Sequence, residues 1–158
     1  MNGTFSGDTI AAISTPVAAG GIGMVRMSGP QAFEIADQIF VSVSHKTVSE
    51  TGGYHGLFGR LHDEQGEIDE AVVFVYRTPR SYTGEDVVEI CCHGGIYLVQ
   101  RTLRACISAG ARPAQAGEFT RRAFLNGKMD LSQAEAVIDV INSENEYALQ
   151  SSVSQLKG

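Results

Sequence analysis

Glu89 stands out as a candidate for chemistry because it is a single carboxylate inside an apolar run. The run is Val87–Cys92, which reads Val-Val-Glu-Ile-Cys-Cys. An unpaired buried charge is very costly, so Glu89 either faces solvent on an edge strand or lies in a pocket with partners. Its two parallel oxygens complement a guanidine-like pair of N–H groups, such as the amino-pyrimidine edge of a pterin. The residue pattern leaves both an exposed edge and a ligand pocket open.

Arg26 is a second charge of this kind, since it interrupts the apolar run Ile22–Met27. It is either an edge arginine whose stem covers the core or a ligand-binding residue, and the sequence around it favours neither. Lys128 lies in Asn126–Asp130, between two predicted helices. Most lysines in such loops are simply solvated, so Lys128 alone indicates no function.

Two glycine-containing stretches fail the spacing of the nucleotide-binding motifs. Gly21–Gly23 begins like a dinucleotide fingerprint, but the third glycine position holds Arg26 and the segment is a predicted strand. Gly127–Lys128 is no P-loop, because the first glycine position holds Arg122 and the hydroxyl position holds Met129. Neither stretch therefore predicts a nucleotide site.

A metal site is not expected at Cys91, Cys92 and His93. Adjacent strand residues point to opposite faces, so at most Cys91 and His93 share one ion, and the sequence offers no second ligand cluster. We also assign no catalytic residue, because groups such as a Ser-His-Asp triad meet only in the fold.

The composition is that of a globular protein. The 158 residues, 43% hydrophobic and 19% charged, suit one domain plus an appendage. The formal net charge of −6 disfavours strong autonomous binding to nucleic acid. No apolar run reaches the ~20 residues that a bilayer requires, and Met1–Gly7 lacks the features of a secretory signal. Three cysteines fit reduced thiols, so we expect a cytoplasmic protein without membrane contact.

Five apolar runs predict the strands that must position these residues. They are Asp8–Ser14, Gly21–Ser28, Tyr54–His62, Glu67–Arg77 and Asp86–Cys92. Residues 63–66 have the composition of a hairpin turn. The fourth run is apolar on both faces, so we expect it to be a central strand.

Four helices are predicted from apolar spacing and end signals. The first begins at Pro30 and ends before the polar stretch Ser42–Glu50. The next two are Ile96–Ala109 and Glu118–Leu125. A capping box begun by Asp130 starts a long helix with an apolar face to the chain end. At ~1.5 Å per residue it makes a rod of about 40 Å. We expect this rod to project and to need a helical neighbour that the chain does not supply.

The order of these elements predicts an α+β fold with an antiparallel or mixed sheet. We expect a domain over residues 1–120, and residues 121–158 as the start of a helical domain.

Several blocks of sequence occur in an order that is diagnostic together, although each alone is weak. They are Asp8–Pro16, Gly20–Gly29, Ser81–Glu89, Cys92–Gly95, Ala116–Leu131 and Gln133–Val137. This ordered set resembles the N-terminal part of the tRNA modification GTPase family known as MnmE or TrmE. Only the stretch around residues 41–70 is undiagnostic.

The resemblance implies a fold and an assembly. In this family the N-terminal domain resembles the tetrahydrofolate-binding fold of glycine-cleavage aminomethyltransferases and forms a homodimer. A central helical domain follows, which Leu131–Gly158 would begin. It carries an inserted G domain that uses GTP, K⁺ and Mg²⁺. That G domain is absent from this chain, from which we expect no GTPase activity.

The resemblance also implies a reaction for the whole enzyme. With an FAD-containing partner subunit of the MnmG type, it installs a carboxymethylaminomethyl-type group at C5 of the tRNA wobble uridine. The one-carbon unit comes from a tetrahydrofolate derivative, the 5-formyl or the methylene form.

Residue by residue, the family's folate-contacting arginine, glutamate and lysine fall on Arg26, Glu89 and Lys128. We expect Glu89 to pair with the pterin edge, and the two basic residues to hold anionic or carbonyl oxygens. One departure is Pro16–Ala19, where the family commonly has Pro-Pro-Gly-Arg. Ala19 replaces an arginine there, so we expect a loop of different shape that lacks any anion contact of that arginine.

Two other functions fit the same residues. One is a stand-alone, folate-dependent aminomethyltransferase-like enzyme. The long terminal helix and the missing second half of that fold argue against it. The other is a purely structural dimerisation domain with an empty pocket. The two charges in apolar strands argue against it.

Overall fold

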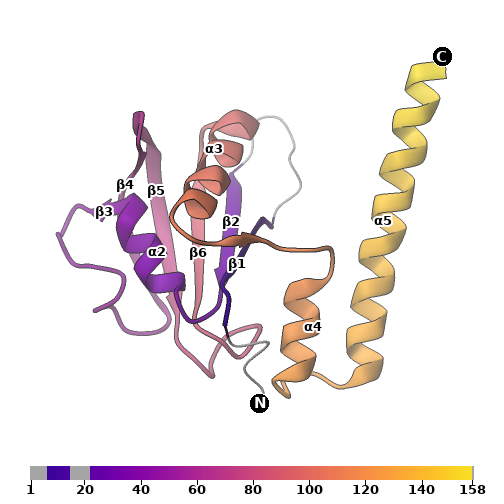
Figure 1. Ribbon diagram of the computed structural model, residues 1–158, viewed down its shortest axis with the longest axis horizontal. Coiled ribbons are helices and arrows are strands. Elements are labelled where there is room, and N and C mark those ends of the chain that lie inside the picture. The colour runs from indigo at the N-terminus through magenta and orange to yellow at the C-terminus, as the bar shows by residue number, and fades with distance from the viewer. Residues whose placement is uncertain (1–6, 15–21, 158) are drawn as a thin grey trace.

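In the part of the chain that the structure describes, a seven-stranded mixed sheet carries α2 and α3 on one face, while α4 and α5 stand beside it (Figure 1). The computed structural model describes residues 7–14 and 22–157, with side chains as far as residue 144. The strands within these residues are β1 (Ile10–Ile13), β2 (Gly23–Ser28), β3 (Phe40–Ser42), β4 (His55–Asp63), β5 (Gly66–Tyr76), β6 (Val87–Cys92) and β7 (Arg112–Pro113). The helices are α2 (Ala32–Ile39), α3 (Gly95–Ser108), α4 (Glu118–Leu125) and α5 (Leu131–Lys157).

The strand order is β3-β4-β5-β6-β2-β1-β7. All neighbours are antiparallel except β1 and β7, which are parallel. The predicted α+β class is thus confirmed, and so are the five predicted strands and the interior position of β5. The sequence did not predict β3 and β7. They are three and two residues long, too short for a periodic pattern.

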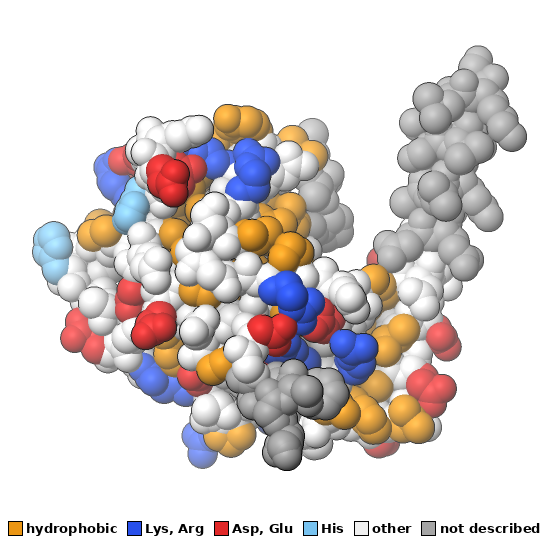
Figure 2. All heavy atoms as spheres, viewed as in Figure 1, with side chains coloured by type: hydrophobic (Ala, Val, Ile, Leu, Met, Phe, Trp, Pro, Cys, Tyr) orange, Lys and Arg blue, Asp and Glu red, His pale blue; other side chains and the backbone are white. Residues whose placement is uncertain are grey.

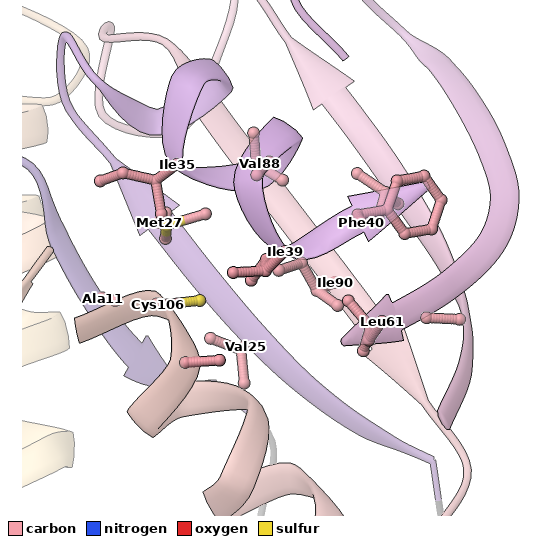
Figure 3. Packing of buried hydrophobic residues seen from close by; sticks show 14 of the residues in the cluster. Ala11, Val25, Met27, Ile35, Ile39, Phe40, Leu61, Val88, Ile90 and Cys106 are labelled. Atoms are coloured by element: carbon pink, nitrogen blue, oxygen red, sulfur yellow. The ribbon is translucent and has the colours of Figure 1, made fainter. Parts of the chain in front are cut away.

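The core lies between the sheet and the pair α2 and α3, as Figure 3 shows. Alternate residues of the central strands, such as Val25 on β2 and Ile90 on β6, point to this face and are fully buried. Ile35 of α2 and Cys106 of α3 pack against them. Full burial of one such aliphatic side chain contributes roughly 1.5–3 kcal/mol. This layer therefore fixes the sheet, and the residues between the buried ones point to the opposite face.

α4 and α5 form a helical pair that projects from the edge of the sheet carrying β1 and β7 (Figure 1). The predicted capping box is confirmed, since the backbone N–H of Asp130 donates to the side chain of Gln133 at 2.9 Å and the reverse bond is 2.8 Å. Gly127 ends α4 with a φ of +75°, which glycine adopts readily. Leu131 and Val140 on α5 are more than half exposed. The long helix projects as predicted, with apolar side chains facing solvent.

None of the helices in residues 7–14 and 22–157 combines the length and the apolar character needed to cross a membrane.

Candidate functional site

Arg26 and Glu89 lie directly opposite each other on β2 and β6. The Arg26 guanidinium donates through Nε at 3.0 Å and through Nη2 at 2.9 Å, and both bonds go to Oε2 of Glu89. The Arg26 side chain is 24% exposed and that of Glu89 is 14% exposed. The two candidates that the sequence places on separate strands are therefore brought together as one partly buried ion pair.

This pair stands in the middle of the sheet, on the face away from α2 and α3. The register places Phe74 of β5 beside Glu89 and Ala12 of β1 beside Arg26, so one row of residues crosses four strands. β6 and β2 both have neighbours on either side. The interpretation of either residue as an edge-strand residue is therefore wrong, because the sheet continues beyond both strands.

The surroundings of Glu89 are desolvated enough to affect neighbouring acids. Burial raises the pKa of the Tyr76 hydroxyl, and the negative charge of Glu89 raises it further. The pKa of the Cys91 thiol is raised by the same two causes in the same order. Both groups stay neutral at physiological pH. They add a hydroxyl and a thiol, but no charge, beside the carboxylate.

Lys128 is not part of this ion pair. It follows α4, is exposed, and donates through Nζ to the carbonyl of Pro79 at 3.0 Å. A Cβ placed on Gly84 would lie 3.3 Å from the Lys128 stem, so the lysine lies against the segment 79–84. The same segment carries Tyr82, whose ring contacts Arg26. The structure thus connects Lys128 to the pair through this loop.

A second charged cluster, which sequence reasoning missed, holds α4 against the sheet. Arg122 is almost fully buried and pairs with Asp8 and with Glu85, at 3.1 Å to the latter. Arg112 of β7 donates to Asp8 at 2.6 Å and also pairs with Glu118. Acidic and basic side chains gather over this junction between sheet and α4 in Figure 2. The spacing of Glu118 and Arg122, four residues apart on a short helix, is the signal that was available.

The cluster extends to the end of β2. Ser28 is fully buried, and its hydroxyl donates to Glu85 at 2.7 Å and contacts the hydroxyl of Thr83 at 2.7 Å. Asn126, just after α4, donates to the carbonyl of Thr83 at 2.8 Å. The segment 78–86 is thereby fastened to both the sheet and α4, next to Arg26.

Beyond the ion pair, the same face of the sheet carries exposed apolar side chains beside the exposed Arg60–Glu67 pair. Phe58 on β4 and Phe74 on β5 lie on the same face as Glu89 and are 46% and 38% exposed. Val41 on β3, paired with Arg60, continues this surface and is half exposed. Large exposed aromatic residues on a sheet face are typical of an interaction surface.

A cavity of about 510 Å³ lies on the opposite side, between α2, α3 and the β4–β5 turn. Arg101, Arg104, Asp63 and Glu64 line it, so its formal charges balance. Arg101 is already occupied by Asp63, with two hydrogen bonds of 2.8 Å. None of the predicted site residues lies in the lining of this cavity.

Within residues 7–14 and 22–157, no three His, Cys, Asp or Glu side chains lie close enough together to hold a metal ion. The Pro16–Ala19 stretch, with Ala19 in place of the family's arginine, lies outside the described residues.

Comparisons with known proteins agree with one another. The family model described as "GTP-binding protein TrmE N-terminus" matches residues 9–128. Proteins named "tRNA modification GTPase MnmE" are similar over nearly the whole chain. The identities are 55% over 152 residues in Lachnoclostridium phytofermentans, 52% over 153 residues in Carboxydothermus hydrogenoformans and 46% over 153 residues in Bacillus subtilis. Each alignment covers 96% of this chain but only 33% of the relative, so the chain spans about a third of these relatives' length.

Proposed function

The chain belongs to the family of the GTP-binding protein TrmE N-terminus, and from this premise we propose that it is the folate-binding and dimerising module of a tRNA modification GTPase. The observation that carries the folate proposal is the Arg26–Glu89 pair. Two opposite charges lie side by side on interior strands, on a face of the sheet that α2 and α3 leave uncovered. A partly buried ion pair adds little net stability, because its desolvation offsets most of its attraction.

The chemistry of the pair fits a reduced folate. A carboxylate has about four lone-pair positions, and Arg26 uses two hydrogen bonds on Oε2 only. Both Arg26 bonds end on Oε2, so Glu89 can accept a pterin N–H group at Oε1 while it still holds Arg26. A parallel pair of N–H groups, one on each oxygen, would also take the place of one Arg26 bond on Oε2. Arg26 keeps further N–H groups for a carbonyl or carboxylate oxygen of the ligand. A tetrahydrofolate derivative, 5-formyl or methylene, supplies the one-carbon unit when bound.

Lys128 is the third folate residue in this proposal. Its ammonium is exposed and holds a single backbone carbonyl, that of Pro79. A lysine on a flexible stem exchanges such a partner readily for an anion. We assign it to the anionic part of the folate, near the loop 79–84.

A second copy of the chain is the proposed occupant of the exposed sheet face. Phe58, Phe74 and Val41 form an apolar surface continuous with the Glu89 row. Aromatic residues are enriched in the buried centre of protein interfaces. The folate site would then lie at the margin of a homodimer interface.

The rest of the enzyme is assigned to the two thirds of the relatives that this chain does not span. We assign residues 1–120 to the folate domain and residues 121–158 to the start of the helical domain. The exposed Leu131 and Val140 would pack against further helices of that domain. GTP, K⁺ and Mg²⁺ would bind in the G domain. The FAD-containing partner subunit and tRNA would bind to the full protein in the cytoplasm.

A purely structural dimerisation domain is the second candidate. It is favoured by one observation, that Arg26 and Glu89 already neutralise each other. In that case the pair would need no ligand.

Calorimetric titration with 5-formyltetrahydrofolate separates the two. We expect saturable binding by the 158-residue chain and its loss in Glu89→Ala. Glu67→Ala is the matched control, because Glu67 pairs with Arg60 in the same sheet but is exposed. Absence of binding by the unaltered chain, or equal affinity of Glu89→Ala, would favour the structural role.

A further inference from the structure

Two aromatic rings from outside the sheet hold the guanidinium of Arg26. Its Cζ lies 5.4 Å from the ring centroid of Tyr82 and 5.5 Å from that of Phe119. Both distances are within the ~6 Å range of a cation–π contact. Tyr82 belongs to the segment 78–86 and Phe119 to α4, so the two rings reach Arg26 from separate elements.

Arg26 needs such support, because Glu89 constrains it at a single atom. Both of its hydrogen bonds to Glu89 end on Oε2, which orients the guanidinium plane less firmly than a fork to both carboxylate oxygens would. A long side chain with this freedom loses entropy when a ligand orders it, and the affinity falls accordingly. Rings on the guanidinium restrict that freedom before a ligand arrives.

The rings are themselves fixed to each other and to the sheet. The Tyr82 hydroxyl and the Thr120 hydroxyl are 2.8 Å apart, and Thr120 follows Phe119 on α4. α4 is fastened to the sheet through buried Arg122. A displacement of α4 therefore moves Phe119 and, through Thr120, Tyr82.

We propose that Tyr82 and Phe119 are positioning residues that hold Arg26 against Glu89, and that they couple the site to α4. The consequence for folate affinity rests on the proposed function, whereas the effect on Arg26 itself does not. α4 leads directly into α5, so the proposal gives the helical part of the protein a route to the folate site.

The test replaces each ring by an aliphatic group of similar reach, in Tyr82→Leu and Phe119→Leu. The first readout needs no ligand. It is the hydrogen-exchange rate of the Arg26 Nε–H in nitrogen-15 NMR spectra, with the signal assigned by its loss in Arg26→Lys. We expect exchange at least about 3-fold faster in each variant, as the loss of one cation–π contact implies. Phe119→Tyr keeps an aromatic face and should restore the slow rate.

The second readout is the dissociation constant for 5-formyltetrahydrofolate, which we expect to rise about 3-fold or more in each leucine variant. Unchanged exchange of the Arg26 Nε–H in both leucine variants would overturn the positioning role, whatever happens to stability. If the unaltered chain binds no folate but exchange accelerates as expected, the proposed function fails and the positioning role stands. Faster exchange with unchanged folate affinity would overturn the coupling of the rings to the site.

Discussion

The Arg26 guanidinium donates two hydrogen bonds to a single oxygen of Glu89, across the contact between β2 and β6. Neither charge is fully buried, and neither is free in solvent. Removal of one partner therefore leaves the other charge partly buried and unpaired, which is costly. The pair nevertheless remains accessible to a ligand from solvent. This combination sets the expected behaviour of variants at both positions.

Arg26→Met should destabilise the fold by about 1–3 kcal/mol, because it leaves the Glu89 carboxylate partly buried without its partner. Urea unfolding measures the change. Arg60→Met is the matched control, since Arg60 pairs with Glu67 across strands of the same sheet but both side chains are more than half exposed. We expect its midpoint to stay close to that of the unaltered chain. Equal effects of the two substitutions would contradict the partly buried character of the Arg26 pair.

Arg122→Met should lower the free energy of unfolding more than any other single substitution in the charged cluster that holds α4 against the sheet. It removes the buried cation that holds Asp8 and Glu85, at an expected cost of about 3–5 kcal/mol. Limited proteolysis should then cut near α4 faster. Arg121→Met, one residue earlier and 55% exposed, provides the control and should leave both stability and cleavage nearly unchanged. Similar behaviour of the two variants would show that the cluster does not anchor α4.

Acid should weaken the fold through three carboxylates with lowered pKa values. The hydrogen bonds from Arg101 lower the pKa of Asp63 to about 2. Burial is the largest single influence on the pKa values of Asp8 and Glu118 and opposes their ionisation. The hydrogen bonds that they accept and the charges of Arg112 and Arg122 together outweigh it, so both pKa values are lowered. The unfolded chain therefore takes up protons first as the pH falls.

The stabilisation from these carboxylates is complete above the unfolded carboxyl pKa of about 4 and is lost as the pH falls toward 2. Urea midpoints measured across this range should decline steadily. Asp63→Asn should lower the midpoint at neutral pH and flatten its dependence on acid. A midpoint that stays constant between neutral pH and about pH 3 would contradict these assignments.

Phe58→Lys should weaken self-association, because it places a charge on the exposed aromatic face of the sheet. Sedimentation velocity at several concentrations measures the effect. Tyr97→Lys is the control, since Tyr97 is 62% exposed but lines the cavity beside α3 on the other side. A monomeric unaltered chain, or equal dissociation of both variants, would argue against this face as the dimer interface.

The strands and helices were predictable because their apolar residues repeat with a clear period. Asp86–Cys92 was predicted as a strand and Ile96–Ala109 as a helix, and the structure has β6 at Val87–Cys92 and α3 at Gly95–Ser108. β3 and β7 were not predictable, because their pairing is decided by the strand beside them and not by their own few residues.

The candidate site was predictable in part. Glu89 and Arg26 were identified as charges in apolar runs, but nothing in either run specifies that the two strands are neighbours in register. The arginine cluster around Arg122 was missed because its members, from Asp8 to Arg122, are far apart in sequence. The contacts of the two rings with Arg26 were not predictable for the same reason. The rings come from a loop and a helix that only the fold brings to Arg26.

The most direct measurement is a crystal structure of the chain soaked with 5-formyltetrahydrofolate. We predict the pterin on the outer face of β6 and β2, with its amino-pyrimidine edge on Glu89 and Arg26 still in place. Folate in the cavity lined by Arg101 and Arg104, or no bound folate at saturating concentration, would contradict the proposed site.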